Sequence, residues 1–66
     1  MKASINGKEH ELPDGLTVAQ LLERLQTPDR GVAVAKNDRV VRRTAFSEEP
    51  VHEGDRIEII KAVAGG

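Results

Sequence analysis

The residues of this chain that could react without a folded catalytic site are its last ones. The sequence of 66 residues ends in Ala64-Gly65-Gly66, so no side chain larger than a methyl group follows residue 63. Glycine adopts backbone conformations that other residues avoid, and such a segment can enter a channel too narrow for bulkier residues. The terminal carboxylate of Gly66, with an ordinary pKa of about 3.5, is ionised at neutral pH and is an accessible oxygen nucleophile. The alternative interpretation is a frayed chain end without function.

Other reactive side chains are few. The chain has no cysteine, which excludes a disulfide, a thiolate nucleophile and a zinc site with sulfur ligands. His10 and His52 fall in different predicted elements without carboxylates at metal-ligand spacing, so we expect one packed and one solvated histidine and no metal. Glu48-Glu49 could act as an acid and base pair, but adjacent carboxylates before a proline are typical of a solvated loop.

The charge balance narrows the class of partner. The chain has 10 Lys and Arg against 11 Asp and Glu, a net charge of −1, whereas binding to DNA or RNA needs clustered cations in excess. Arg39, Arg42 and Arg43 form the densest basic patch, and without interleaved aromatic residues they favour a solvated face or a protein-docking face. No run is apolar enough for a signal peptide or a membrane span, so we expect a cytoplasmic protein with no membrane partner.

The first half of the chain predicts a hairpin and a helix. Alternating apolar residues over 1–5 and a second strand over 8–12 flank Asn6-Gly7, a dipeptide that favours a tight hairpin turn. In that register Ala3 faces His10, which puts His10 on the core side. Thr17 and Gln20 form a capping box, and the stripe of Val18, Leu21, Leu22 and Leu25 predicts a helix of about ten residues that ends before Pro28.

The second half predicts a second hairpin and a central strand. Residues 32–35 and 39–42 flank the turn Asn37-Asp38, and Phe46 is expected to anchor the following loop in the core. Residues 56–63 form the strongest strand signal and have apolar residues on both faces, which indicates a central strand. We therefore expect an α+β fold, a mixed sheet of four to five strands with one helix on one face, in which the first and last strands can run parallel.

The chain resembles the ThiS family of sulfur carrier proteins of thiamine biosynthesis over essentially its whole length. The residues that carry the resemblance are Asn6-Gly7, Thr17-Val18-Ala19, Leu21-Leu22, Val32-Ala33-Val34-Ala35, Asn37, Val40-Val41, Arg43, Gly54-Asp55-Arg56-Ile57-Glu58-Ile59, Ala62-Val63 and Gly65-Gly66. The resemblance implies a ubiquitin-like β-grasp domain over residues 1–63 and a flexible tail over 64–66.

The resemblance also implies a mechanism centred on Gly66. An E1-like enzyme of the ThiF type would use ATP and Mg²⁺ to adenylate the Gly66 carboxylate, sulfur from a cysteine desulfurase would replace AMP to leave a thiocarboxylate, and a thiazole synthase of the ThiG type would take that sulfur. The acyl adenylate supplies the leaving group that a carboxylate lacks. The chain itself would be a carrier and co-substrate, without a bound cofactor or an active site of its own.

The sequence departs from the family at three positions: Arg42 stands where members often have proline, Phe46 where they often have tryptophan, and Ala64 where many have glycine. For partner docking we single out Ile60 and Ala62, expected to face outward, together with Arg42 and Arg43.

Three other functions stay open. The chain could carry sulfur for molybdopterin or cysteine synthesis, it could be a ubiquitin-like modifier joined through Gly66 to lysines of other proteins, or it could be an interaction module with an inert tail.

Overall fold

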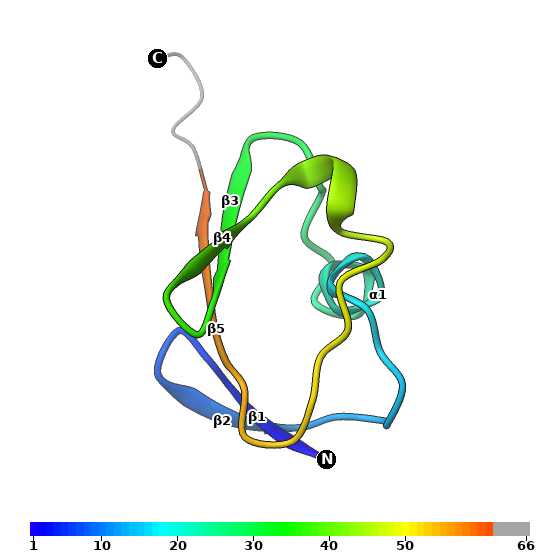
Figure 1. Cartoon of the computed structure of the whole chain (residues 1–66), viewed down its shortest axis with the longest axis vertical. Helices are drawn as coiled ribbons and strands as arrows, with labels where there is room; N and C mark the ends of the chain where they lie inside the picture. Colours follow the sequence, from blue (N-terminus) through cyan, green and yellow to red (C-terminus); the bar gives the residue numbers. More distant parts are fainter. Residues whose placement is uncertain (62–66) are drawn as a thin grey trace.

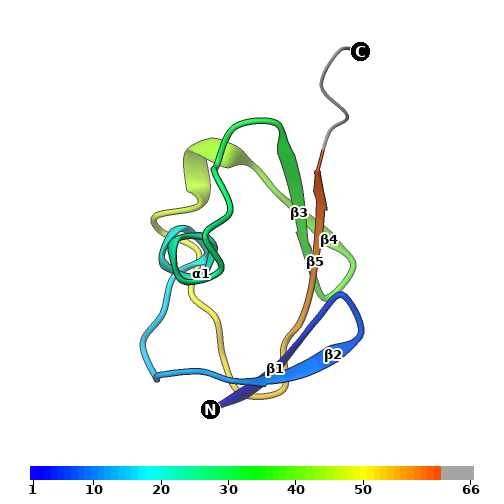
Figure 2. The ribbon, with the colours of Figure 1, turned by 180° about the vertical axis from the view of Figure 1, so that it is seen from behind.

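A five-stranded mixed sheet with one helix on one face makes up the fold (Figure 1). The computed structural model describes residues 1–61. Its elements in chain order are β1 (Lys2–Ile5), β2 (Lys8–Glu11), α1 (Val18–Arg24), β3 (Val32–Lys36), β4 (Arg39–Val41), the 3₁₀ helix η1 (Arg43–Ala45) and β5 (Arg56–Lys61). The strand order across the sheet is β2-β1-β5-β3-β4, and Figure 2 shows from behind that α1 covers one side and leaves the other open. The predicted architecture is confirmed.

The first hairpin has the predicted register, with Ala3 opposite His10 and Ile5 opposite Lys8. Asn6 and Gly7 both have positive φ, 52° and 85°, as this tight turn requires. His10 lies opposite the buried Ala3, as the predicted register requires, and is half-buried.

The helix begins as predicted and ends earlier than predicted. Thr17 accepts from the backbone N–H of Gln20, and the Gln20 side chain accepts from the Thr17 backbone N–H, so the capping box is present. The helix ends at Arg24 rather than just before Pro28, because Gln26 adopts a left-handed conformation with φ of 56°. The prediction of about ten residues was therefore wrong; α1 has seven.

β5 is the central strand, as predicted, because it is parallel to β1 and antiparallel to β3. Its inward residues Ile57 and Ile59 are buried, while Ile60 points to the open side. The buried core lies between sheet and helix and comprises Ala3, Ile5, Leu12, Val18, Leu21, Leu22, Val34, Val41, Phe46, Val51, Ile57 and Ile59.

Phe46 anchors the chain between β4 and β5 in the core, as predicted, and its backbone carbonyl accepts a hydrogen bond from Ala19 N–H at 2.9 Å. No periodic pattern in the sequence indicates η1, which precedes Phe46 as a single 3₁₀ turn. Such short turns carry no amphipathic repeat that a sequence pattern could reveal.

Candidate functional site

The predicted reactive residue, Gly66, lies outside the described residues, as do Ala62, Ala64 and Gly65. The structure instead shows how the residues that precede this segment, at the end of β5, are held in the sheet. Lys61 ends β5 opposite Val32 of β3, so the last described residue is held in the sheet. The segment 62–66 therefore continues from the end of the central strand.

The open side of the sheet has exposed apolar side chains beside Glu58, which lies opposite Ala35. Ile60, predicted to face outward, is 66% exposed and lies opposite Ala33 of the neighbouring strand. Val40 of β4 is 80% exposed and lies opposite Ala35 of the same strand. The register therefore places Ile60 and Val40 on one face, two strands apart. We call Ile60, Ala33, Ala35 and Val40 the outer apolar patch.

Val40 was not among the predicted docking residues. The sequence contains a signal for it, because in the pair Val40-Val41 only one side chain can point inward from an edge strand. Which of the two is buried depends on the pairing with β3, where Val41 lies opposite the buried Val34.

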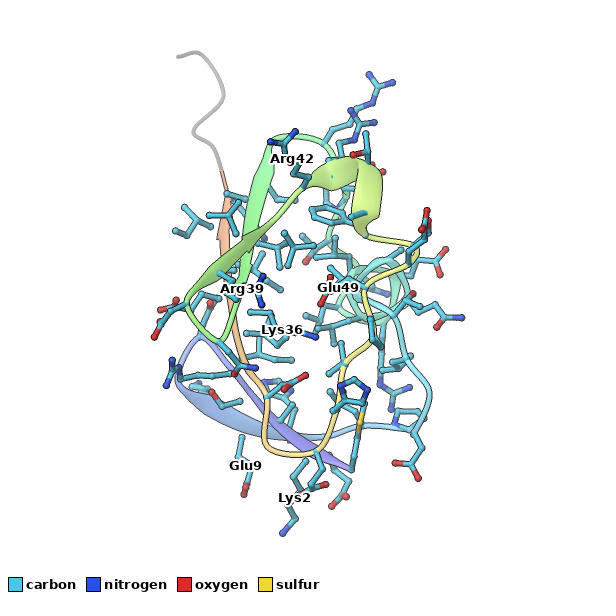
Figure 3. The ribbon with its side chains drawn as sticks, viewed as in Figure 1. Lys2, Glu9, Lys36, Arg39, Arg42 and Glu49 are labelled. Carbon is cyan, nitrogen blue, oxygen red and sulfur yellow. The ribbon has the colours of Figure 1, made fainter. Side chains whose placement is uncertain are left out.

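The two arginines predicted for docking lie at the same end of the sheet as Lys61. Arg42 follows β4 directly, and Figure 3 places its side chain at the end of the sheet where β5 finishes. Arg43 begins η1, and its Nε lies 3.7 Å from Oδ2 of Asp29. Both arginines are exposed. The structure thus brings together Ile60, Arg42 and Arg43, the three predicted docking residues that it describes.

A polar cluster ties the opposite end of β5 to the β3–β4 turn. The side chain of Asp55, the one buried charged residue within 1–61, accepts from Asn37 Nδ2 at 3.0 Å and from the backbone N–H of His52 at 2.7 Å. Asn37 Oδ1 in turn accepts from Arg56 N–H at 2.9 Å. Lys36 Nζ lies 3.8 Å from Asp55 Oδ2. The cluster joins β3, β5 and the loop before β5.

Asp55 stays ionised in this cluster. Burial alone would raise the pKa of its carboxyl, but hydrogen bonds from His52 N–H and Asn37, together with the nearby Lys36 ammonium, hold the pKa below its ordinary value. His52 itself is exposed, with Nδ1 4.0 Å from Asp55 Oδ2. This confirms the expected solvated histidine.

The expectation of a wholly solvated Glu48-Glu49 pair was wrong for Glu49. Its carboxylate lies 2.7 Å from Lys36 Nζ and it is half-buried, whereas Glu48 is exposed. Lys36 Nζ also donates to the Pro50 carbonyl at 2.7 Å, so the ammonium has partners in the loop on the helix side of the sheet (Figure 3). The sequence alone could not predict the pair of Lys36 and Glu49, because the two residues are 13 positions apart and only the fold brings them together.

The same cluster lines a hollow of about 420 Å³ beside the β3–β4 turn. In the part of the chain that the structure describes, every buried side-chain nitrogen and oxygen has a hydrogen-bond partner. The buried polar atoms of the cluster are therefore satisfied within the protein, as a structural role requires.

Residues 1–61 contain no group of three or more His, Cys, Asp or Glu arranged to hold a metal ion. None of the helices described in that range is long and apolar enough to cross a membrane.

Comparison with known proteins links this chain to one family. The model of the ThiS family matches residues 2–66. The chain is 33% identical over 66 residues to the sulfur carrier protein ThiS of Escherichia coli, with all of both chains covered. It is also 36% identical to a thiazole synthase of Paramagnetospirillum magneticum, but it spans only 20% of the length of that protein.

The fold agrees with a solved structure of the same description. The crystal structure of the thiamine biosynthesis protein ThiS from Geobacter metallireducens superposes with a TM-score of 0.86 at 32% identity and covers 100% of both chains. The similarity includes the five-stranded mixed sheet with a single helix, the β-grasp arrangement expected from the sequence.

Proposed function

The chain belongs to the ThiS family and has a sulfur carrier role in thiamine biosynthesis, and we propose that the carboxylate of Gly66 is the atom group that carries the sulfur. One observation carries this proposal: the family match runs through residue 66, so the terminal Gly65-Gly66 is part of the shared pattern. The position of the segment after the central strand supports it, because β5 is held by neighbours on both sides.

The proposed chemistry proceeds in balanced steps. A carboxylate oxygen of Gly66 attacks the α-phosphorus of ATP on an E1-like enzyme of the ThiF type, which also holds Mg²⁺, and pyrophosphate leaves. A persulfide sulfur, formed by a cysteine desulfurase, then attacks the acyl carbon and AMP leaves. A thiol reduces the resulting acyl disulfide, so that the terminal sulfur stays on Gly66 as a thiocarboxylate and the thiol is oxidised to a disulfide. The carrier needs no active site of its own in this scheme.

The acceptor in the proposal is a thiazole synthase of the ThiG type. Transfer of sulfur to a carbonyl carbon of the acceptor's substrate, with an oxygen of that substrate or of water taking its place on the acyl carbon, would return Gly66 to a carboxylate, ready for another cycle. The match to a protein named thiazole synthase supports this partner, because a segment similar to this chain makes up part of that longer protein.

The proposal also assigns a docking role to Ile60, Ala62, Arg42 and Arg43. Five residues separate Lys61 from the end of the sequence, and an extended chain spans at most about 3.6 Å per residue, or about 18 Å in total. An adenylating enzyme that holds Gly66 in its active centre must therefore come close to this end of the sheet. Ile60 directly precedes Lys61 and is exposed, so an enzyme that comes this close can make an apolar contact with it and with the outer apolar patch.

The decisive measurement is the intact mass of the protein purified gently from its host, with fragmentation of the C-terminal peptide. Replacement of one oxygen by sulfur on Gly66 is the expected result. Gly66 joined to a lysine of another protein would instead identify a modifier and contradict the carrier role.

A one-residue extension tests the covalent mechanism independently. Adding alanine after Gly66 moves the carboxylate away from the position that the adenylating enzyme must reach, so formation of the thiocarboxylate should fall below detection while the thermal midpoint is unchanged. As a matched control, Ala64→Gly, which restores the glycine that many family members have, should keep full activity. Thiocarboxylate formation by the extended chain would refute the mechanism.

Ile60→Ser tests the docking assignment. Because Ile60 is 66% exposed, the substitution should leave the unfolding midpoint nearly unchanged. Loss of an apolar contact acts mainly on dissociation, so the complex with the purified adenylating enzyme should dissociate about tenfold faster, measured by biolayer interferometry. An unchanged dissociation rate would remove Ile60 from the docking surface.

A further inference from the structure

The charges of this protein are unevenly distributed along its long axis. The end of the sheet where β5 finishes has four cationic side chains, which we call the basic rim: Arg30, Arg42, Arg43 and Lys61. Arg30 lies two residues before β3, whose first residue is paired with Lys61, and the two adjacent arginines follow β4. All four side chains are exposed.

Little acidic charge neutralises the basic rim. Four of the chain's 10 Lys and Arg residues, but only one of its 11 Asp and Glu residues, Asp29, lie in segments 29–31 and 42–45 and at Lys61. Among residues 1–61, the one ion pair of the rim is Arg43 Nε to Asp29 Oδ2 at 3.7 Å. Both side chains of that pair are more than half exposed, so the pair is weak and a partner can displace it at little cost.

The opposite end of the molecule has carboxylates and cations side by side. Segments 9–15 and 52–55 have five carboxylates and no Lys or Arg: Glu9, Glu11, Asp14, Glu53 and Asp55. Figure 3 shows Glu9 at this end with Lys2, far from Arg42. The N-terminal ammonium lies 3.3 Å from Asp14 and 3.9 Å from Glu11. Lys2, Lys8, Lys36 and Arg56 lie among these carboxylates, so their charges largely balance there, in contrast to the basic rim.

We infer that the basic rim docks on an acidic protein surface around the opening that receives the C-terminal segment, and that it orients the chain so that this segment arrives first. The inference rests on the proposed function, because the reach of about 18 Å obliges a partner that holds Gly66 to face the rim. Opposite charges across an interface raise the association rate and fix orientation more than they raise affinity.

A protein fits this surface better than a nucleic acid does. The four cations have no aromatic side chain among them on which a base could stack, and a chain with a net charge of −1 lacks the excess of cations that nucleic-acid binding needs. A protein patch a few carboxylates wide is enough to match four cations.

The test measures association kinetics of the purified ThiF-type adenylating enzyme with the full chain. We expect the association rate of the wild type to fall about tenfold or more between about 50 and 500 mM NaCl. The double variant Arg42→Glu with Arg43→Glu should associate about tenfold more slowly at low salt, with a much smaller change in the dissociation rate.

A matched double variant separates local charge from net charge. Lys2→Glu with Lys8→Glu alters the net charge by the same amount on the β1–β2 hairpin, and we expect its association rate to change less than about twofold. Circular dichroism and urea unfolding should show both double variants folded. Equal slowing by the two variants, no slowing by either, or association that is insensitive to salt would each overturn the inference.

Two further outcomes are decisive. Tighter binding of a DNA duplex than of the enzyme, lost on reversal of the two rim arginines, would make the rim a nucleic-acid site and overturn the inference. A thiocarboxylate on Gly66 in the host together with salt-insensitive association would overturn the rim alone, whereas failure of every chain to bind the enzyme would overturn both proposals.

Discussion

At the scale of single residues, Asp55 is the group whose surroundings matter most for stability. It is buried and accepts hydrogen bonds from Asn37 and from the His52 backbone, with Lys36 nearby. Hydrogen bonds to a charged acceptor contribute more than neutral ones, about 1.5–3 kcal/mol each. The carboxylate therefore stabilises the joint between the β3–β4 turn and the start of β5.

Stability should fall in acid because of Asp55. Its pKa is lower in the folded protein than in the unfolded chain, so its contribution is complete above about pH 3.9 and is lost as the pH falls through the folded pKa. The groups that face it are Lys36, His52 and Asn37. Asp55→Asn should cost about 1.5–3 kcal/mol at pH 7 and flatten the loss of stability below about pH 3.9, measured by urea unfolding across pH.

The matched control is Asp38→Asn. This carboxylate is exposed, and asparagine tolerates its positive φ of 68°, so the free energy of unfolding should change by less than about 1 kcal/mol. If Asp55→Asn had as small an effect as the control, the buried carboxylate would not hold this joint.

At the scale of elements, the side chain of Asn6 continues the pairing between β1 and β5 beyond the strand. Asn6 Oδ1 accepts from Ile59 N–H at 2.8 Å and Nδ2 donates to the Ile59 carbonyl at 3.2 Å. The Asn6 backbone N–H donates to the Ile57 carbonyl at 2.9 Å. One residue therefore forms the hairpin turn and also supports the second half of β5, the part that leads to the C-terminal segment.

Asn6→Gly separates these two roles. Glycine keeps the positive φ of the turn but removes both side-chain hydrogen bonds to Ile59, so we expect a loss of about 1–3 kcal/mol in urea unfolding and faster amide exchange at Ile59. Lys8→Ala in the same hairpin, at an exposed position, should change stability by less than about 0.5 kcal/mol. Equal effects of the two substitutions would show that the side-chain bonds of Asn6 are dispensable.

At the scale of the whole molecule, the fold places three features at one end. The central strand finishes there, the outer apolar patch adjoins it, and the basic rim surrounds it. The far end has the polar cluster of Asp55, which joins the β3–β4 turn to β5. The end to which we assign docking is therefore separate from the cluster that joins the β3–β4 turn to β5.

The sequence alone was sufficient for the local features, because each depends on neighbours within a few positions. The Asn6-Gly7 turn, the capping box at Thr17 and the alternation around Ile57 were all confirmed. The early end of α1 was missed, since nothing in the residue types required the left-handed conformation of Gln26. The assignment of Gly66 also came from sequence, through a pattern that runs over the whole chain.

Only the tertiary structure decided the contacts between residues distant in the chain. Lys36 with Glu49, Asn6 with Ile59 and Asn37 with Asp55 are pairs that no local pattern indicates. The gathering of Arg30 with Arg42, Arg43 and Lys61 at one end likewise depends on the strand order and register. The physical reason is that local conformation follows from short-range sterics and hydrogen bonds. A surface made of residues from several segments forms only after burial of the core has fixed how the strands pair.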